Sequence, residues 1–248
     1  MAKSRADHLV LTRGLADSRA RAQALILAGK IFSGTRRVEK PGQLLAEDAP
    51  LSCRGEEHPW VSRGGVKLAY ALDHFSLSPA GRIGLDIGAS TGGFTDVLLA
   101  RGAARVHAVD VGHGQLAWKL RTDARVVVHE RVNARFLDQE RIGEPVGAIV
   151  ADASFIGLET LLPAPLALAA PGAFAIALIK PQFEAGRDGV GKGGIVRDGA
   201  VRAAVAQRIF GWWARLPGWR VLGVTESPIT GADGNHEFLI AAIYEGEA

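Results

Sequence analysis

Three charged residues stand at the ends of apolar segments, where an α/β protein can place reactive side chains. Asp152 and Lys180 each directly follow an apolar segment of strand length, and Glu237 directly precedes another. Ligands of parallel sheets bind beyond the carboxyl ends of the strands, so these positions lie near a site. A lysine that follows an apolar strand is costly unless it is paired or opens into a cleft. Each residue alone is more often a surface charge, but the three together indicate a catalytic site.

The segment 82–96 has the pattern of a strand, a tight glycine turn and a helix. Such a unit aims the free N–H groups of the helix amino terminus at a nucleotide-type ligand. Ser90 replaces the middle glycine of a dinucleotide fingerprint, and the carboxylate of Asp86 would repel a diphosphate. Asp110 ends the next apolar segment, where an acidic side chain binds ribose hydroxyls.

These features predict S-adenosylmethionine rather than NAD as the cofactor, because a carboxylate before the turn suits a ligand that carries an ammonium and a sulfonium. The alternative is a glycine turn that serves only the topology. The predicted cofactor site comprises Asp86, Gly88, Ser90, Thr91, Gly92, Gly93, Phe94, Asp110 and Asn133.

Apolar segments alternate with helical patterns through most of the chain, which predicts a Rossmann-like, doubly wound α/β domain with helices on both faces of the sheet. The uncharged stretch 161–179 is long enough to cross a bilayer, but its prolines divide it into a helix, a turn and a buried strand. The glycine-rich segment 184–194 is either a mobile loop near the site or a plain connector. We expect strands over 83–87, 105–109, 125–128, 146–151, 173–179, 219–225 and 238–244, and helices near 93–101, 115–121, 157–169 and 199–215.

The composition is that of a globular protein: 248 residues, 48% hydrophobic and 22% charged. The single cysteine, Cys53, excludes an internal disulfide, and the first residues lack the apolar segment of a signal peptide, so we expect a cytoplasmic protein. The net charge of +3 conceals an asymmetry, because residues 1–40 hold nine basic and three acidic side chains. A basic amino-terminal module indicates an anionic polymer as partner, although a solvated charged face is the simpler explanation.

Helical spacing over 6–13 and a second helix capped by Asp17 or Ser18 precede short β segments between 31 and 45. The segment 19–32 resembles the alpha-L RNA-binding domain, which implies docking on structured RNA through phosphate contacts. We predict this small α+β domain over 1–52, a linker over 53–62 and the catalytic domain over 63–248. The predicted RNA-binding residues are Lys3, Arg5, Arg19, Arg21, Lys30 and Arg36.

Four further segments, 62–68, 86–96, 152–156 and 179–184, resemble motifs of the TlyA family. Members of that family pair an alpha-L domain with an FtsJ-like methyltransferase domain, and some are labelled hemolysins. The resemblance implies S-adenosylmethionine-dependent methylation of a ribose 2′-hydroxyl, with a cytidine of ribosomal RNA as the substrate. It also implies a catalytic tetrad of Lys67, Asp152, Lys180 and Glu237, the last placed by the shorter match over 235–238.

The chemistry of that reaction requires alignment of the hydroxyl with an activated methyl group and removal of one proton. Lys180, if partial burial and Lys67 favour its neutral form, can serve as the base, with Asp152 holding it and Glu237 orienting Lys67. Which lysine takes the proton stays open. No metal is expected. Two other hypotheses are an RNA-binding assembly factor without catalysis and a membrane-active lysin, the latter disfavoured by the proline-broken stretch.

Overall fold

The computed structural model divides the chain into two compact units, 1–57 and 58–248, which are described separately. Part of the predicted linker (54–57) and three positions of the glycine-rich segment (187, 188 and 192) lie outside the described residues, as does Asp17. The structure describes residues 3–16, 18–53, 58–186, 189–191, 193–231 and 234–246.

The amino-terminal unit is a small α+β fold. Helices α1 (Ala6–Thr12) and α2 (Arg19–Leu27) pack through Val10, Ala22 and Ile26, and Ser18 caps α2 by accepting a hydrogen bond from the Arg21 N–H. The predicted β segments between 31 and 45 belong to two separate small sheets, and those on either side of the turn at Gly34 pair antiparallel as a hairpin. In one, β1 (Lys3–Arg5) pairs with β4 (Leu44–Ala46); in the other, β2 (Ile31–Ser33) lies between β3 (Arg36–Arg37) and β5 (Leu51–Cys53).

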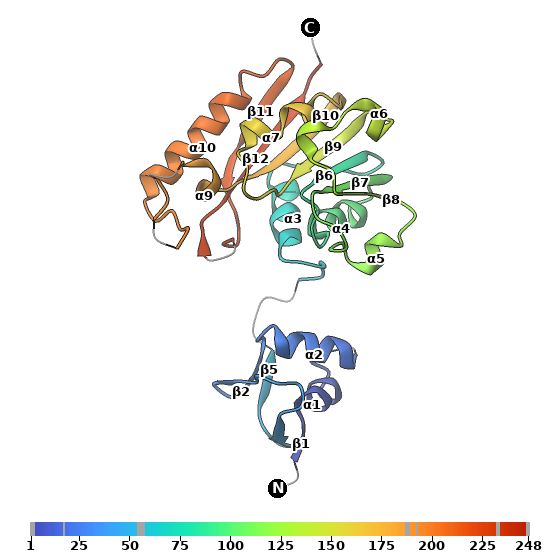
Figure 1. Ribbon diagram of the computed structural model, residues 1–248, viewed down its shortest axis with the longest axis vertical. Coiled ribbons are helices and arrows are strands. Elements are labelled where there is room, and N and C mark those ends of the chain that lie inside the picture. Colours follow the sequence, from blue (N-terminus) through green and yellow to red (C-terminus); the bar gives the residue numbers. More distant parts are fainter. Residues whose placement is uncertain are drawn as a thin grey trace. The chain divides into compact units, whose positions relative to one another are not determined.

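The second unit is built on a seven-stranded sheet in the order β11-β12-β10-β9-β6-β7-β8 (Figure 1). All strand pairs are parallel except those of β12, which runs antiparallel to both β10 and β11. The chain reverses its direction of winding between β6 and β9, and ligands of such sheets bind at this switch point. The strands are β6 (Ile83–Ile87), β7 (Arg105–Asp110), β8 (Val126–Glu130), β9 (Val146–Ala151), β10 (Ala169–Ile179), β11 (Trp219–Glu226) and β12 (Phe238–Tyr244).

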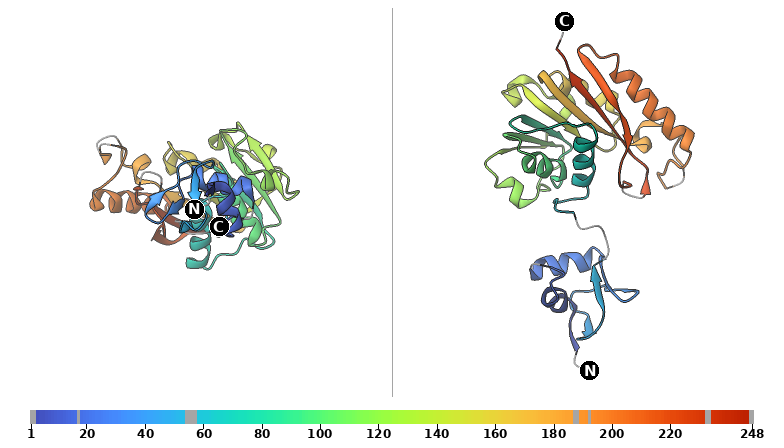
Figure 2. Two further views of the ribbon diagram at one scale, coloured as in Figure 1. Left: turned by 90° about the horizontal axis from the view of Figure 1, so that it is seen from below. Right: turned by 180° about the vertical axis from the view of Figure 1, so that it is seen from behind.

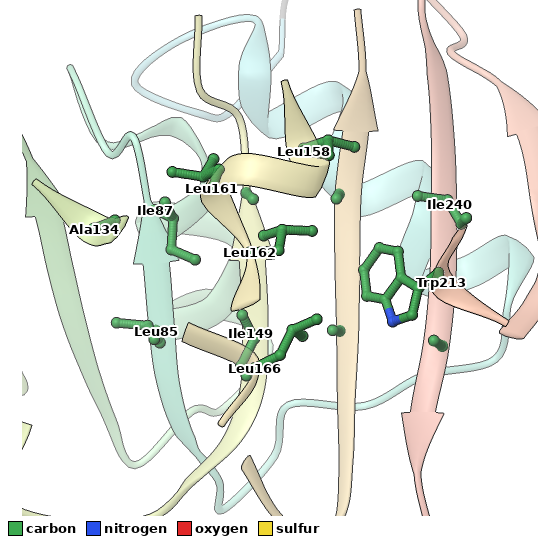
Figure 3. Close-up of a cluster of buried hydrophobic side chains, with 14 of the residues drawn as sticks. Leu85, Ile87, Ala134, Ile149, Leu158, Leu161, Leu162, Leu166, Trp213 and Ile240 are labelled. Carbon is green, nitrogen blue, oxygen red and sulfur yellow. The ribbon is translucent and has the colours of Figure 1, made fainter. Parts of the chain in front are cut away.

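Helices cover both faces of this sheet, so the predicted Rossmann-like α/β architecture is confirmed. Alternate strand residues face opposite sides, and Leu85 and Ile149 belong to one core while Val106 and Val150 belong to the other. The first core also contains α7 (Leu158–Leu161), α8 (Pro163–Leu166), α6 (Gln139–Ile142) and α10 (Gly199–Trp213), as Figure 3 shows for Leu161, Leu162, Leu166 and Trp213. The second contains α3 (Gly64–His74), α4 (Gly93–Ala100) and α5 (Trp118–Arg121).

Two predicted elements differ from the structure. The expected helix over 157–169 is split into α7 and α8, because Pro163 begins a new helix and lacks the N–H that would continue the old one. Strand β10 begins at Ala169 rather than 173, and its register with β9 shifts before Phe174, where Pro171 and Gly172 interrupt regular pairing. The long helix α10 precedes the edge strand β11 in the chain and lies beside it (Figure 2).

Candidate active site

Lys67 and Glu237 form a buried ion pair. Lys67 lies in the second turn of α3, and Glu237 directly precedes β12. The Lys67 Nζ lies 2.5 Å from Glu237 Oε2, and the two residues are only 7% and 4% exposed. Because β12 is antiparallel, Phe238 pairs with Ile179, so the start of β12 lies at the sheet edge where the parallel strands end. This reversal brings Glu237 to the same edge as Lys180.

Lys180 is held by two oxygens from the neighbouring loop. Its Nζ lies 2.6 Å from Asp152 Oδ1 and donates a hydrogen bond of 3.0 Å to Ser154 Oγ. Strands β9 and β10 are parallel neighbours, with Ala177 opposite Ala151, so both residues leave the sheet at its carboxyl edge. Lys180 is 9% exposed, whereas its partner Asp152 is more accessible. The structure therefore brings together the four residues of the predicted tetrad as two ion pairs.

A cavity of about 400 Å³ opens onto these side chains. Lys67, Asp152 and Lys180 line it together with Arg63 and the glycine turn. One cavity thus presents two lysines and a carboxylate to any molecule that enters it. The walls are also partly apolar through Phe94, which is 3% exposed and belongs to the second core.

The glycine turn is shaped by close contacts that exclude side chains. A Cβ on Gly88 would lie 2.9 Å from the Asp152 carbonyl oxygen, and one on Gly93 would lie 2.2 Å from Ser62 Oγ. Gly88 (φ +80°) and Gly92 (φ +97°) adopt left-handed conformations. Ser90 also has a positive φ, and both Ser90 and Thr91 are exposed in the cavity wall.

A second cavity, of about 460 Å³, shares Gly88, Ser90, Asp152 and Ser154 with the first. Asp110 lines it, as do Asn133 and the exposed side chains of Val111 and Phe155. The Asp110 carboxylate accepts the N–H groups of Ser90 (2.8 Å) and Gly112 (2.7 Å), one on each oxygen, and each oxygen retains a lone pair. Asn133 accepts the N–H of Arg135 and thereby caps a short 3₁₀ turn, Ala134–Phe136.

Asp86 is placed differently from the other predicted cofactor residues. It is fully buried, and among the described residues it does not line either cavity. Its Oδ2 accepts both the N–H (2.8 Å) and the hydroxyl (2.6 Å) of Thr95, which fastens β6 to α4. Burial, helped by the negative charges of Asp152 and Asp110, raises the pKa of Asp86 to about 7, against the opposing effect of the Thr95 hydrogen bonds.

Three residues near the cavities were not assigned a role from the sequence. Ser154 binds Lys180, and its sequence signal is its place in the motif 152–156, two positions after Asp152. Asp96 accepts the Val61 N–H at 2.8 Å and the Lys119 ammonium at 3.0 Å, which ties the segment before α3 to α4. Phe155 is 89% exposed with a positive φ of 66°, and its ring centroid lies 4.9 Å from that of Phe183.

The predicted RNA-binding residues of the amino-terminal unit fall into two groups. Arg5 and Arg19 both pair with the fully buried Asp7, at 2.9 and 3.2 Å, and their hydrogen bonds, led by that of Arg5, lower the pKa of Asp7. Gln23 adds a third donor at 2.9 Å, so these arginines stabilise the junction of α1 and α2. The other predicted residues are half-buried Lys30 and exposed Lys3, Arg21 and Arg36.

The comparisons with known proteins agree with this geometry. The model of the FtsJ-like methyltransferase family matches residues 60–244. The chain is 49% identical over 243 residues to a 16S/23S rRNA (cytidine-2′-O)-methyltransferase TlyA of Mycobacterium tuberculosis, covering 96% of this chain and 89% of that protein. The chain belongs to the TlyA family of FtsJ-like methyltransferases. The resemblance predicted from the sequence motifs is confirmed.

Other relatives of the family carry a different label. Hemolysin A of Brachyspira hyodysenteriae is 40% identical over 236 residues, which cover 95% of this chain and 98% of that protein. A solved structure of a Streptococcus thermophilus protein named as a hemolysin matches with a TM-score of 0.77 and 40% identity, over 100% of this chain and 90% of that one. No helix in the described part of the chain is long and apolar enough to cross a membrane.

The cofactor of the family is S-adenosylmethionine, and the residues present fit it. The second cavity offers a carboxylate with free lone pairs at Asp110, and the turn at Gly88 leaves no room for a side chain. Both cavities meet at Gly88 and Asp152, so a ligand in one is adjacent to a reactant in the other. Within the described ranges, no cluster of three or more His, Cys, Asp or Glu side chains could hold a metal ion.

Proposed function

We propose that this protein methylates the 2′-hydroxyl of a cytidine ribose in ribosomal RNA, in the cytoplasm. The observation that carries the proposal is Lys180, which stands in the first cavity with its Nζ between Asp152 Oδ1 and Ser154 Oγ. The second, independent ion pair of Lys67 and Glu237 completes the tetrad of ribose methyltransferases. The names of the 49% identical relatives support ribosomal RNA and cytidine as the substrate.

S-adenosylmethionine supplies a methyl group on a positively charged sulfur. The ribose 2′-oxygen would accept that methyl group, and Lys180 would take the proton that the hydroxyl gives up. The neutral Lys180 amine has two N–H bonds and one lone pair; one N–H binds Ser154 Oγ, and Asp152 Oδ1 lies 2.6 Å from the nitrogen. Because Lys180 lines the cavity, its lone pair can accept the proton from a hydroxyl there.

Lys67 serves as the fixed cation of the site. Its Nζ is pinned by Glu237, which leaves N–H groups to bind the ribose oxygen and hold it in line with the methyl group. The partly apolar walls at Phe94 favour a reaction in which the sulfur loses its positive charge, since the starting sulfonium is poorly stabilised there. Lys67 therefore orients the substrate, and Lys180 moves the proton.

The amino-terminal unit is assigned to RNA docking, as an alpha-L domain. The exposed cations Lys3, Arg21 and Arg36 are the ones that we assign to phosphate contacts, which give affinity and register without reading sequence. Arg5 and Arg19 bind the buried Asp7, so we assign them a mainly structural role, although roughly half of each side chain is exposed.

The experiment is mass mapping of methylated ribose in ribosomal RNA from cells that lack the enzyme, after incubation with the purified protein and cofactor. We expect one additional methyl group on the ribose of a cytidine, and none with Lys180→Ala. Methylation on a base would overturn the ribose assignment. Normal RNA binding without any transfer would favour the alternative of a non-catalytic assembly factor.

A further inference from the structure

The two segments that carry the reactive side chains leave adjacent strands and then diverge. Asp152, Ser154 and Phe155 follow β9, whereas Lys180 begins a short helix, α9 (Pro181–Glu184), after β10. The Lys180 contacts join the two segments inside the first cavity, and the Phe155 and Phe183 rings, whose centroids lie 4.9 Å apart, join them a second time. Both of these contacts are at least partly accessible to solvent.

A third connection lies outside the cavity and is buried. The side chain of Glu184, at the end of α9, is only 4% exposed. Its Oε1 accepts the backbone N–H of Leu158 at 2.7 Å, and its Oε2 lies 2.8 Å from Arg208 Nη2. The Glu184 carboxylate also packs against Gly157, whose added Cβ would lie 3.3 Å from Oε2.

The partners of Glu184 are themselves firmly anchored. Leu158 is 3% exposed and starts α7 inside the first core, as Figure 3 shows. Arg208 lies on α10, and it also binds the Glu184 carbonyl oxygen (3.1 Å) and Glu159 Oε1 (2.5 Å). Glu184 therefore links the end of α9 to α7 and α10 at once.

We propose that Glu184, held by Arg208, is a positioning residue that fixes Lys180 relative to Asp152 and Ser154. Burial of a carboxylate costs free energy of folding. Capping of the Leu158 N–H at the start of α7 does not require a buried charge, so capping alone does not explain Glu184. What the contact provides is a rigid distance between two loops, four residues after Lys180 and six after Asp152. A displacement of the base by about 1 Å can lower a transfer rate by about a hundredfold. The inference rests on the proposed function.

The test compares Glu184→Ala and Arg208→Ala with the control Glu159→Gln; Glu159 lies on α7 and binds the same arginine, but it does not contact α9. We expect single-turnover methyl transfer, measured well below the melting temperature of every variant, to fall tenfold to a hundredfold in the first two and less than twofold in the control. Arg208→Lys, which keeps one charged bond to Glu184, should recover most of the rate.

Hydrogen exchange separates this inference from the proposed function. Peptides over 153–161 and 180–186 should exchange faster in Glu184→Ala than in the wild type, and the Glu159→Gln peptides should not. Unchanged exchange in Glu184→Ala, or a lower melting temperature with an unchanged transfer rate, would overturn the positioning role. If the wild-type protein transfers no methyl group to RNA, the proposed function fails, and the exchange data alone decide whether Glu184 holds the two loops together.

Discussion

Breaking the ion pair of Lys67 and Glu237 should destabilise the fold far more than removing it entirely. The charges are 2.5 Å apart and nearly inaccessible to solvent, so each depends on the other for compensation. Removal of one partner from such a pair costs about 3–5 kcal/mol, because it leaves an uncompensated buried charge. Replacement of both by apolar side chains of similar volume is neutral or stabilising by about 1–4 kcal/mol. We therefore expect Lys67→Met and Glu237→Met each to lose about 3–5 kcal/mol, and the double variant to be at least as stable as the wild type.

The assay is urea unfolding of the four proteins, followed by calorimetry with S-adenosylmethionine and single-turnover methyl transfer. The double variant should be folded and should bind the cofactor, but its transfer rate should be lost, because the cation that orients the ribose is gone. Additive destabilisation by the two substitutions would show that the charges do not compensate each other. A double variant with near-normal transfer would refute the catalytic role of the pair.

Three further predictions concern other parts of the molecule. Gly88→Ala should lower cofactor affinity, measured by calorimetry, at least tenfold, because its Cβ would meet the Asp152 backbone at 2.9 Å. The control is Gly81→Ala, which has the same left-handed backbone strain but open space around its Cβ, and it should leave that affinity unchanged. The unfolding free energy of the wild type, relative to that of Asp86→Asn, should fall by about 4 kcal/mol at most as pH rises from about 4 to about 7. The reason is that Asp86 keeps its proton to a higher pH in the folded state than in the unfolded chain. A parallel pH dependence of the two proteins in urea unfolding would contradict the raised pKa. Replacing Arg21 and Arg36 by alanine should reduce the slope of log K for RNA binding against log salt concentration by about one per arginine, without changing the stability of the protein. An unchanged slope in filter binding would remove these residues from the RNA interface.

The residues that the sequence alone identified are those whose signal is local. Asp152 and Lys180 stand at the ends of apolar segments, and the sheet topology makes such positions adjacent in space. The glycine turn is equally local, since its positive φ angles and close contacts require glycine at fixed positions. Lys67 could be identified only through the family resemblance, because its partner Glu237 lies 170 positions away and reaches it through the reversed strand β12.

Charge counts were less informative about individual side chains. The basic excess of residues 1–40 does not distinguish Arg19, which binds the buried Asp7, from Arg21, which is exposed. The strand pattern places Asp86 at the turn but does not reveal that its side chain points away from the cavities toward Thr95. Such distinctions depend on packing between elements, which periodicity along one element does not contain.

The central claim is that Lys180 removes the proton from a ribose hydroxyl, and single-turnover rates across pH test it most directly. Lys180→Ala and Lys180→Arg are compared with the wild type at saturating cofactor and RNA. We predict loss of transfer in both variants, because arginine keeps its charge and cannot accept a proton, while cofactor and RNA affinity stay nearly unchanged. Retention of most of the rate and of the wild-type pH profile in Lys180→Arg would contradict the claim and leave this lysine only a positioning charge.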